Sequence, residues 1–306
     1  MKYYDIPNSD LHVSAVGLGC MRIAEKSEAE VKNLITGSLD AGINFFDHAD
    51  IYGGGKCEEI FGKVLAENPS LRDQMILQSK TCIKPGVSYE SSEEYIVNSV
   101  NEILSRLHTD HLDVLLLHRP DALLDPEEVA KAFDNLKKAG KVRYFGVSNM
   151  NPGQIQLIEK YTKEPLLFNQ LQFSPLHAYM IDRGIHVNMN DQWAYDRDGG
   201  VLDFCRLNDI TIQCWSILGV DQYHPSYLDN PDYPKLNAVL QKLADKYSVS
   251  KNAIVVAWIL RHPAGMQPII GTTNPVHAAE MAKGADIHLT HDEWYEIYLA
   301  ENKPLP

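Results

Sequence analysis

The stretch Ile43-Asn44-Phe45-Phe46-Asp47-His48-Ala49-Asp50-Ile51-Tyr52 carries the strongest structural signal in the chain. Its apolar start predicts a buried strand, and ionisable side chains follow abruptly before a run of three glycines at 53–55. Asp47 and Tyr52 therefore fall where a strand gives way to a loop. In a parallel sheet or barrel, the carboxyl ends of the strands are where active sites form. We expect the rest of the chain to supply partners for these two side chains.

The same order of short strand and helix recurs along the chain. The first unit has a strand near 16–20 and a helix over 27–40, which Ser27 and Glu30 open as a capping box. Further strands are expected at 43–46, 74–79, 112–117, 142–147, 166–171, 210–215 and 267–270, with helices at 56–67, 91–107, 126–139, 152–161, 200–208, 234–247, 251–261 and 275–283. About eight such units predict a (β/α)8 TIM barrel, and a doubly wound open sheet is the alternative.

We expect a single domain spanning residues 1–306, in which the segments outside these units are additions to the barrel. Alternating residues around the turn at 7–10 predict a β-hairpin over 2–16, ahead of the barrel. Two connections, 172–199 and 216–233, exceed the usual loop length and are rich in aromatic residues. Such loops on a barrel are typical of lids or pocket walls, the alternative being insertions without a role. Among their side chains are Tyr179, Trp193, Tyr195, Tyr223, His224, Tyr227 and Tyr233.

Composition excludes several classes of function. A net charge of −13 argues against a nucleic-acid-binding surface. The five cysteines are odd in number and never form a C-x-x-C pair, which argues against disulfides and structural zinc. No apolar run approaches the ~18 residues that cross a bilayer, and no signal peptide is evident. We therefore expect a cytoplasmic protein with no membrane partner, and a monomer by default.

Four ionisable side chains are expected to meet at one end of the fold. Lys80 ends the strand predicted over 74–79, and His118 ends the strand predicted over 112–117. With Asp47 and Tyr52 they follow three strands, whose carboxyl ends converge at one mouth of a barrel. A lone strand-end lysine is usually solvated and a lone histidine usually belongs to the core. The functional interpretation therefore depends on the four occurring together.

This set suits acid–base chemistry on a carbonyl group. The ordinary pKa of tyrosine, near 10, is high for proton exchange at neutral pH. The ammonium of Lys80 is expected to lower the pKa of Tyr52, and Asp47 to keep Lys80 charged. Neutral His118 can orient a carbonyl oxygen by a hydrogen bond. Since no side chain donates hydride, a nicotinamide cofactor is implied.

A metal-dependent hydrolase is a second interpretation of the same region. It would use the side chains of Asp47, His48, Asp50 and His118. No H-x-H pair supports it, so we expect no metal.

Specific motifs extend this pattern over nearly the whole chain. They are Asp47-His-Ala-Asp-Ile-Tyr52-Gly, Lys80 after a strand, Leu-Leu-Leu-His118-Arg-Pro, Gly-Lys-Val-Arg-Tyr-Phe-Gly146-Val-Ser148-Asn149 and Pro268-Ile-Ile-Gly271. Together they resemble the aldo-keto reductase family, and the HADIYG and HRPD forms are similar to a bacterial branch of predicted oxidoreductases. The resemblance implies a hairpin-capped barrel that reduces aldehydes and ketones with NAD(P)H. It makes Tyr52 the proton donor, Lys80 and Asp47 its tuners, and His118 the carbonyl-orienting group.

The resemblance also implies a cofactor site along the barrel mouth. Ser148, Asn149 and Gln170 would hydrogen-bond the nicotinamide carboxamide, and Trp215 would stack on its ring. The remaining contacts would come from Gly19, Cys20, Met21 and Asp47 near the nicotinamide ribose, Arg22, Ser216, Leu218 and Gly219 along the pyrophosphate, and Gly271, Thr272, Thr273, His277 and Glu280 around the adenosine.

The adenosine end departs from the family pattern. Members that prefer NADPH usually grip its 2′-phosphate with a lysine near Gly271 and an arginine near His277, and neither cation is present here. A histidine cannot form the bidentate fork of an arginine. NADP(H) is therefore only slightly favoured over NAD(H). A non-catalytic NADP(H)-binding redox sensor is the alternative function, and the presence of all four acid–base positions counts against it.

Overall fold

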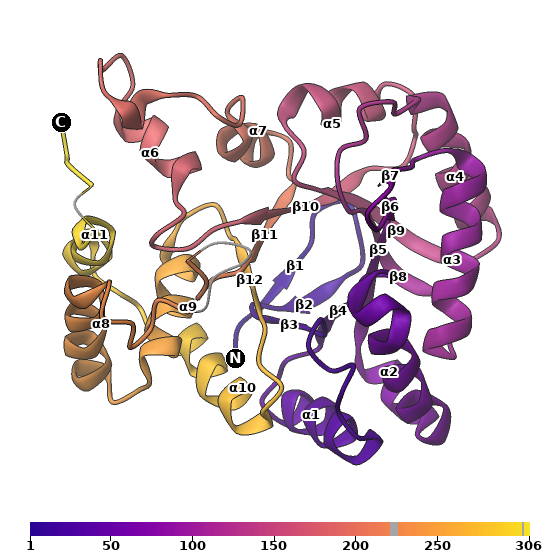
Figure 1. Ribbon diagram of the computed structural model, residues 1–306, viewed down its shortest axis with the longest axis horizontal. Helices are drawn as coiled ribbons and strands as arrows, with labels where there is room; N and C mark the ends of the chain where they lie inside the picture. Colours follow the sequence, from indigo (N-terminus) through magenta and orange to yellow (C-terminus); the bar gives the residue numbers. More distant parts are fainter. Residues whose placement is uncertain (221–225, 302) are drawn as a thin grey trace.

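A closed eight-stranded parallel barrel organises the computed structural model, which describes residues 1–220, 226–301 and 303–306. Around the barrel the strands follow the order β10–β11–β12–β3–β4–β5–β8–β9 (Figure 1). Their bounds are Gly17–Gly19 (β3), Phe45–Asp47 (β4), Ile76–Thr81 (β5), Leu112–Leu117 (β8), Val142–Ser148 (β9), Leu166–Gln172 (β10), Thr211–Trp215 (β11) and Gln267–Ile270 (β12). The predicted (β/α)8 barrel is confirmed.

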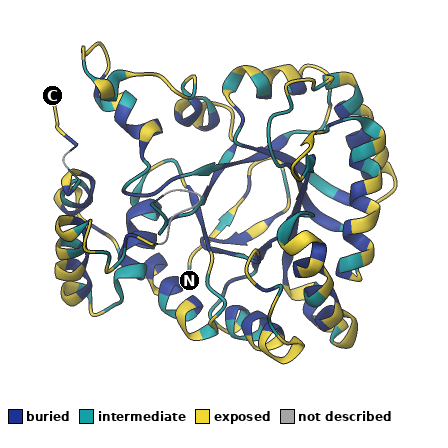
Figure 2. Ribbon diagram, viewed as in Figure 1, coloured by how far each residue is buried: buried dark blue, intermediate teal, exposed yellow. Residues whose placement is uncertain are grey.

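Helices surround the barrel, and most of them have a buried side and an exposed side (Figure 2). They are α1 (Glu28–Asp40), α2 (Lys56–Glu67), α3 (Glu93–Leu107), α4 (Pro126–Lys138), α5 (Pro152–Glu159), α6 (Tyr179–Ile185), α7 (Val201–Leu207), α8 (Pro234–Tyr247), α9 (Lys251–Arg261), α10 (Pro275–Ala282) and α11 (His291–Leu299). The side chain of Ser27 accepts from the Glu30 amide while Glu30 bonds back, so the predicted capping box starts α1.

The expected hairpin is present at the amino end of the chain. It pairs β1 (Tyr3–Asp5) with β2 (His12–Ser14) and lies across one end of the barrel (Figure 1). Its apolar side chains Ile6, Leu11 and Val13 share one buried cluster with the interior residues of five strands. The hairpin therefore closes the end opposite the carboxyl ends of the strands, and any ligand must enter from the other side.

The structure adds elements where the sequence predicted irregular chain. The connection 172–199 contains α6 and the 3-10 helix η3 (Gln192–Ala194), and α11 follows the last predicted unit. A small hairpin of β6 (Ile83–Lys84) and β7 (Ser88–Tyr89) also extends from the end of β5. Within the connection 216–233, Tyr223 and His224 lie outside the described residues, whereas Tyr227 is fully buried and donates to the Ile217 carbonyl at 2.9 Å.

Candidate active site

Lys80 is the centre of a buried polar cluster at the carboxyl ends of the strands. Its Nζ donates to Asp47 Oδ2 at 2.8 Å, to the Tyr52 hydroxyl at 2.9 Å and to the His48 carbonyl at 2.9 Å. Asp47 is the last residue of β4, Lys80 lies within β5, and Tyr52 begins the 3-10 helix η1 (Tyr52–Gly55). All three ammonium protons therefore have acceptors, and the side chain can be fully buried while charged.

His118 completes the expected group of four. It directly follows β8, and its ring lies 6.0 Å from that of Tyr52 at an angle of 85°. Its Nδ1 is buried without a hydrogen-bond partner among the described residues. Buried donors without acceptors are rarer than buried acceptors without donors. We therefore assign the neutral ring the tautomer that carries its proton on Nε2.

The electrostatics of the cluster follow from burial and pairing. Burial lowers the pKa of Lys80, but attraction to Asp47 and Tyr52 outweighs it, and the pKa lies above the ordinary 10.5. Burial, with repulsion from Lys80 and Arg119, holds the pKa of His118 well below 6.5, so this ring is neutral at pH 7.

One electrostatic expectation is wrong for Tyr52. Its pKa is raised above 10, because burial outweighs the lowering effect of Lys80, and Asp47 adds to the rise. The ammonium therefore limits the increase rather than bringing the pKa below its ordinary value. Tyr52 is fully protonated at neutral pH and can serve as a proton donor.

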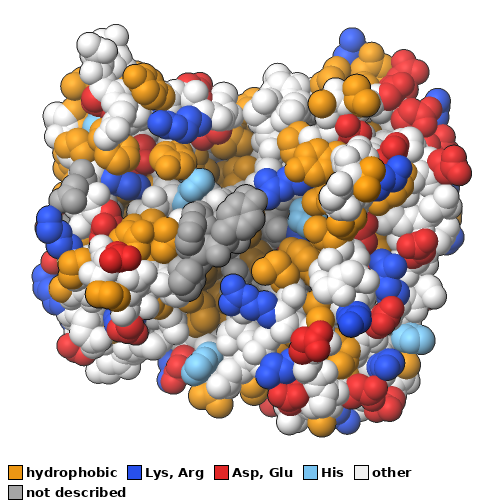
Figure 3. Space-filling view, viewed as in Figure 1, with side chains coloured by type: hydrophobic (Ala, Val, Ile, Leu, Met, Phe, Trp, Pro, Cys, Tyr) orange, Lys and Arg blue, Asp and Glu red, His pale blue; other side chains and the backbone are white. Residues whose placement is uncertain are grey.

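A cavity of about 1120 Å³ opens onto this cluster and runs toward α10. Figure 3 views the hollowed face of the molecule on which it lies. Asp47, Tyr52 and His118 line it, whereas Lys80 lies behind them. The cavity brings together most of the expected cofactor residues, namely Gly19, Met21, Arg22, Ser148, Asn149, Gln170, Trp215, Ser216, Leu218, Gly219, Gly271, Thr272 and His277.

Three expected cofactor residues are not among those that line this cavity: Cys20, Thr273 and Glu280. Cys20 is only 1% exposed, and burial raises the pKa of its thiol well above 9.0. Because residues alternate sides along a strand, the position after Gly19 turns toward the helices rather than the cavity. Its amide still donates to the Asp47 carbonyl at 2.8 Å, which links the first strand to the polar cluster.

Amide and hydroxyl groups form the wall next to His118. Ser148 Oγ donates to the Gln170 carbonyl at 2.9 Å and accepts from Asn149 Nδ2 at 2.8 Å. The indole of Trp215 donates to Asn149 Oδ1 at 3.1 Å, which fixes the orientation of its ring. Asn149 has φ +58°, in the left-handed region that asparagine tolerates better than most residues. The guanidinium of Arg119 lies over the Trp215 ring, 5.7 Å from its centre.

The far end of the cavity meets the beginning of α10. The Asn274 side chain caps this helix by accepting from the Val276 amide, and Thr272 Oγ1 in turn accepts from the Asn274 amide. His277 lies in the first turn and is exposed. A helix N-terminus with hydroxyl and imidazole groups around it is suited to an anionic group.

Sequence reasoning missed several lining residues. They include Ile51, Gly53, Ile83, Ile217, Ser226, Asn252, Ile269 and Ile270. Ile51 is next to Tyr52 and Ile217 is next to Ser216 in the sequence, so their place in the cavity wall could have been predicted from these neighbours. Asn252 lies in the first turn of α9, and only the closure of the barrel brings it to this wall.

The long connection 172–199 contributes none of its three predicted aromatic residues to the cavity lining. Instead, the guanidinium of Arg197 lies over Tyr179 at 4.9 Å and Tyr195 at 5.7 Å. Trp193 is placed by η3, whose Asp191 accepts from the Trp193 amide. The connection 216–233 does reach the cavity, through residues 216–219 and Ser226.

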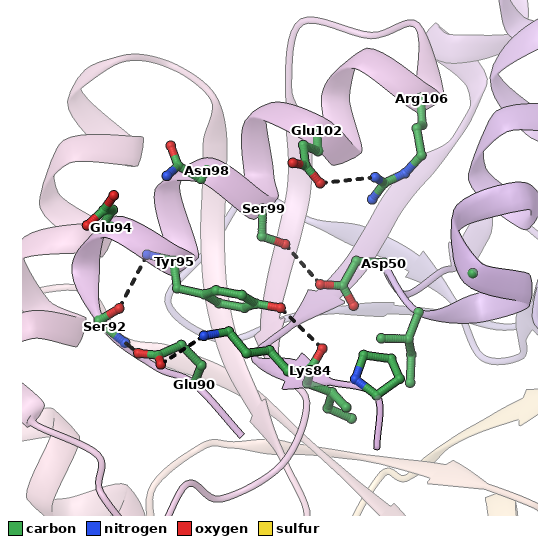
Figure 4. Close-up of a pocket in the computed structure, with 14 residues that line it drawn as sticks. Asp50, Lys84, Glu90, Ser92, Glu94, Tyr95, Asn98, Ser99, Glu102 and Arg106 are labelled. Carbon is green, nitrogen blue, oxygen red and sulfur yellow. Dashed lines mark hydrogen bonds and ion pairs between the residues drawn. The ribbon is translucent and has the colours of Figure 1, made fainter. Parts of the chain in front are cut away.

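Asp50 points away from the cluster, into a second cavity of about 690 Å³ (Figure 4). Its Oδ2 accepts from Ser99 Oγ at 2.9 Å. The side chain of His48 is buried between the barrel and α2, where its ring meets Phe61 at 4.5 Å. The side chains proposed for a hydrolytic metal site therefore diverge, and within the described ranges no group of three or more His, Cys, Asp or Glu side chains could hold a metal ion.

The barrel carries a buried lysine and aspartate at its open end, with a tyrosine and a histidine beside them that face the cavity, and this is the architecture of a barrel oxidoreductase. Residues 15–300 match the aldo/keto reductase family, and the chain belongs to that family. It is an NAD(P)H-dependent oxidoreductase, as its family and its relatives that carry the name oxidoreductase indicate. These matches support NADP-dependent carbonyl reduction as its general activity.

Relatives agree with this assignment, and solved structures agree with the fold. The chain is 36% identical to the uncharacterized oxidoreductase YcsN of Bacillus subtilis, over 95% of each chain. It is 33% identical to a 6-dehydroglucose reductase of Novosphingobium aromaticivorans, over 97% of this chain and 95% of the relative. Its fold resembles the thermostable aldo-keto reductase Tm1743, with a TM-score of 0.78, 24% identity and coverage of 98% and 100%. A Bombyx mori aldo-keto reductase solved with NADP has a TM-score of 0.74 at 21% identity, with coverage of 98% and 92%.

Helix length and hydropathy bear on membrane association. Throughout the part of the chain that the structure describes, no helix combines the length and the apolar character that a membrane span requires.

Proposed function

We propose that this protein reduces the carbonyl group of a small aldehyde or ketone, with Tyr52 as the proton donor. The observation that carries the proposal is the position of Lys80 Nζ, within hydrogen-bond distance of both the Tyr52 hydroxyl and Asp47. The Tyr52 hydroxyl donates its proton to the carbonyl oxygen as that oxygen gains negative charge. The phenolate left behind forms beside an ammonium that is already in place.

The other side chains act on charge and orientation. Asp47 keeps Lys80 protonated inside the barrel, so the ammonium is available when the phenolate forms. Neutral His118 donates from Nε2 to the same carbonyl oxygen and fixes its direction relative to Tyr52. The nicotinamide cofactor supplies the hydride when it is bound. No metal is needed in this scheme.

The donor set of the large cavity fits such a cofactor. Gln170 and Asn149 have amide groups at the wall for the carboxamide, and the Trp215 ring offers a flat face for stacking. Arg22 and residues 216–219 provide groups for the pyrophosphate. The start of α10 faces the remaining part of the cavity, where the adenosine phosphate would lie.

The finer properties follow the same reasoning. NADP(H) is slightly favoured over NAD(H), because Thr272 and the α10 N-terminus attract a 2′-phosphate, although the sequence has no lysine near Gly271 and a histidine, not an arginine, at position 277. A carbonyl-bearing sugar is one candidate substrate class, since two relatives that are 33% and 32% identical are named 6-dehydroglucose reductases. We further propose that the protein acts as a cytoplasmic monomer, which light scattering after size-exclusion chromatography tests.

The substitution Tyr52→Phe tests the role of the proton donor. It removes one hydroxyl, so we expect carbonyl reduction to fall by more than about a hundredfold while cofactor binding changes less than about threefold. Turnover is measured by NADPH oxidation with an aldehyde, and binding by quenching of tryptophan fluorescence with NADPH and with NADH.

Each outcome of these two measurements has a distinct meaning. Full activity in the variant would refute the role of Tyr52. Saturable cofactor binding by the wild-type protein without turnover of any carbonyl would favour the redox-sensor alternative. Absence of saturable binding of either nucleotide would contradict the oxidoreductase mechanism as a whole.

A further inference from the structure

Four buried glutamines form one connected group inside the barrel, directly below the candidate active site. They are Gln78 on β5, Gln170 on β10, Gln213 on β11 and Gln267 on β12, and none is more than 3% exposed. The three on β10, β11 and β12 lie side by side, since Gln213 is in register with both Gln170 and Gln267. β5 lies four positions from β11 in the eight-stranded order, so Gln78 faces the other three from the opposite side.

Hydrogen bonds join these side chains to one another and to Asp47. Gln78 Nε2 donates to Asp47 Oδ1 at 2.7 Å and to Gln213 Oε1 at 2.9 Å. Gln170 Nε2 donates to the same Gln213 Oε1 at 3.0 Å. Gln213 Nε2 donates to Gln267 Oε1 at 2.9 Å, and Gln267 Nε2 donates to the Ser14 carbonyl at 2.8 Å.

Two groups that only accept, the Asp47 carboxylate at one end and the Ser14 carbonyl at the other, determine which way the amides in this group point. A carboxylate only accepts, so the Gln78 atom that faces it must be the nitrogen. The second proton of that nitrogen then requires an oxygen on Gln213, which leaves the Gln213 nitrogen for Gln267. Gln78 Oε1 is buried without a partner among the described residues, so this orientation persists although it leaves one acceptor unsatisfied.

The same reasoning reaches the cofactor wall. Gln170 donates its Nε2 to Gln213, so its Oε1 is left to accept a hydrogen bond from a carboxamide NH2 group. The orientation of an amide at the cavity is thus tied to a carboxylate across the barrel. Asp47 itself is held at both oxygens, by Gln78 on one and Lys80 on the other.

We propose that Gln78 and Gln213 are positioning residues that hold Asp47 and Gln170 in one fixed arrangement across the barrel interior. This inference rests on the proposed function, because it gives Asp47 a role in proton donation and Gln170 a role in cofactor binding. Gln78 acts on the proton-donating side and Gln213 acts on both sides. The proton-donating group around Asp47 and the cofactor wall around Gln170 are therefore coupled through the glutamines that join their strands.

The substitution Gln78→Met tests the proton-donating side. Methionine has a similar size and cannot donate, so Asp47 keeps only Lys80 as a side-chain partner. The Asp47 carboxylate then attracts the Lys80 ammonium more strongly. The ammonium stabilises the Tyr52 phenolate less, so the pKa of Tyr52 rises. In steady-state reduction of an aldehyde by NADPH, we expect kcat to fall about tenfold and the alkaline limb of kcat/KM to move up by about half a pH unit. NADPH affinity should stay within about twofold.

The substitution Gln213→Met tests the coupling. It removes the common acceptor of Gln78 and Gln170, so Gln170 is free to rotate. We expect the dissociation constant of NADPH, measured by tryptophan quenching, to rise about three- to tenfold, which corresponds to the loss of one hydrogen bond. Activity should fall as well, because Gln78 retains only its bond to Asp47.

A glutamate at position 213 should restore the NADPH affinity that the methionine variant loses. In Gln213→Glu, a protonated carboxyl can accept from Gln78 and Gln170 and donate to Gln267, as the amide does. The ionised carboxylate keeps both acceptor roles and loses only the donation to Gln267, so we expect NADPH to bind more tightly to Gln213→Glu than to Gln213→Met at every pH, and most tightly where the introduced carboxyl is protonated. Affinity that matches the methionine variant at every pH would contradict the hydrogen-bonding role.

Ser79→Ala is the matched control for a purely structural loss. Ser79 is also buried on β5 but faces outward, where it donates to Glu58 at 2.6 Å. Its loss should lower the melting temperature without moving the pH limb or the NADPH affinity. If Gln78→Met and Gln213→Met behave like this control, the glutamines only stabilise the barrel and the inference is wrong. Absence of turnover in the wild-type protein would instead contradict the proposed function.

Discussion

His48 shows how one residue can be central to the site without taking part in the chemistry. Its carbonyl accepts from Lys80 Nζ, yet its ring is fully buried and neither nitrogen has a partner among the described residues. Burial, with repulsion from Lys80, lowers the pKa of this ring to about 3. The ring must therefore stay neutral while the protein is folded.

This lowered pKa predicts a loss of stability in acid. The unfolded chain binds a proton near pH 6.5 and the folded chain does not, so the contribution is complete above pH 6.5 and declines as the pH falls toward 3. At pH 5 the loss from His48 is about 2 kcal/mol. We expect His48→Leu to remove about that much of the difference in unfolding free energy between pH 7.5 and pH 5.0, measured by urea denaturation. The exposed His288→Leu should leave the difference unchanged, and an unaltered difference in His48→Leu would show that the ring is solvated.

At the residue scale, the sequence predicted which residues form the site better than it predicted their pKa values. The four ionisable residues were found because strand ends in a barrel converge, which is a property of the chain pattern. The direction of the Tyr52 pKa shift could not be found that way. It depends on how completely the hydroxyl is buried, and local sequence does not encode burial by distant strands.

At the scale of elements, patterns with strong end signals were predicted well. Helices with capping boxes or an N1 proline, such as α1, α4 and α10, begin within about a residue of their expected positions. β5 was placed two residues early, so Lys80 lies inside the strand rather than after it. α6 and α11 were missed; α6 is short and lies in a stretch dominated by polar and glycine residues.

The N-terminus of α10 is an element whose chemistry can be changed by one residue. His277 lies in its first turn and is exposed, at the positive end of the helix dipole. The substitution His277→Arg adds a permanent cation with a bidentate fork, so we expect NADPH to bind about tenfold more tightly and NADH to bind as before. Fluorescence titrations with the two nucleotides measure the ratio.

The control for this change is an arginine at a comparable helix start elsewhere. His291 is the exposed first residue of α11, which does not line the cofactor cavity. His291→Arg should leave the NADPH to NADH ratio unaltered. A ratio that does not move in His277→Arg would place the 2′-phosphate away from α10.

At the scale of the whole molecule, barrel closure creates contacts that no local pattern contains. Gln78 and Gln213 are 135 residues apart and meet only because β5 and β11 face each other across the interior. Asn252 reaches the cavity for the same reason. Gln78, Gln213 and Gln267 were passed over at the sequence level, since a polar residue in an apolar run normally indicates a solvent-facing position; Gln170 was expected only through the family resemblance.

A second long-range contact joins the connection 172–199 to the end of the described chain. Asp182 on α6 is 1% exposed, and its Oδ1 accepts from the Tyr298 hydroxyl of α11 at 2.8 Å and from Lys303 Nζ at 3.2 Å. Burial lowers the pKa of Lys303, while Asp182 opposes that effect. This buried pair holds the connection against the helical layer of the barrel.

Removing one partner of a buried ion pair leaves an uncompensated charge, whereas removing both does not. We expect Lys303→Met to lower the unfolding free energy by about 3 kcal/mol and to expose the connection 172–199 to proteolysis. The double variant Lys303→Met with Asp182→Asn should recover most of both losses, because the amide still accepts from Tyr298 without a charge. Lys242→Met, which breaks an exposed pair with Glu296, should change the free energy by less than about 1 kcal/mol. Equal losses in Lys303→Met and in the double variant would mean that Lys303 acts through its packing, and the charge on Asp182 would then have no part in holding the connection in place.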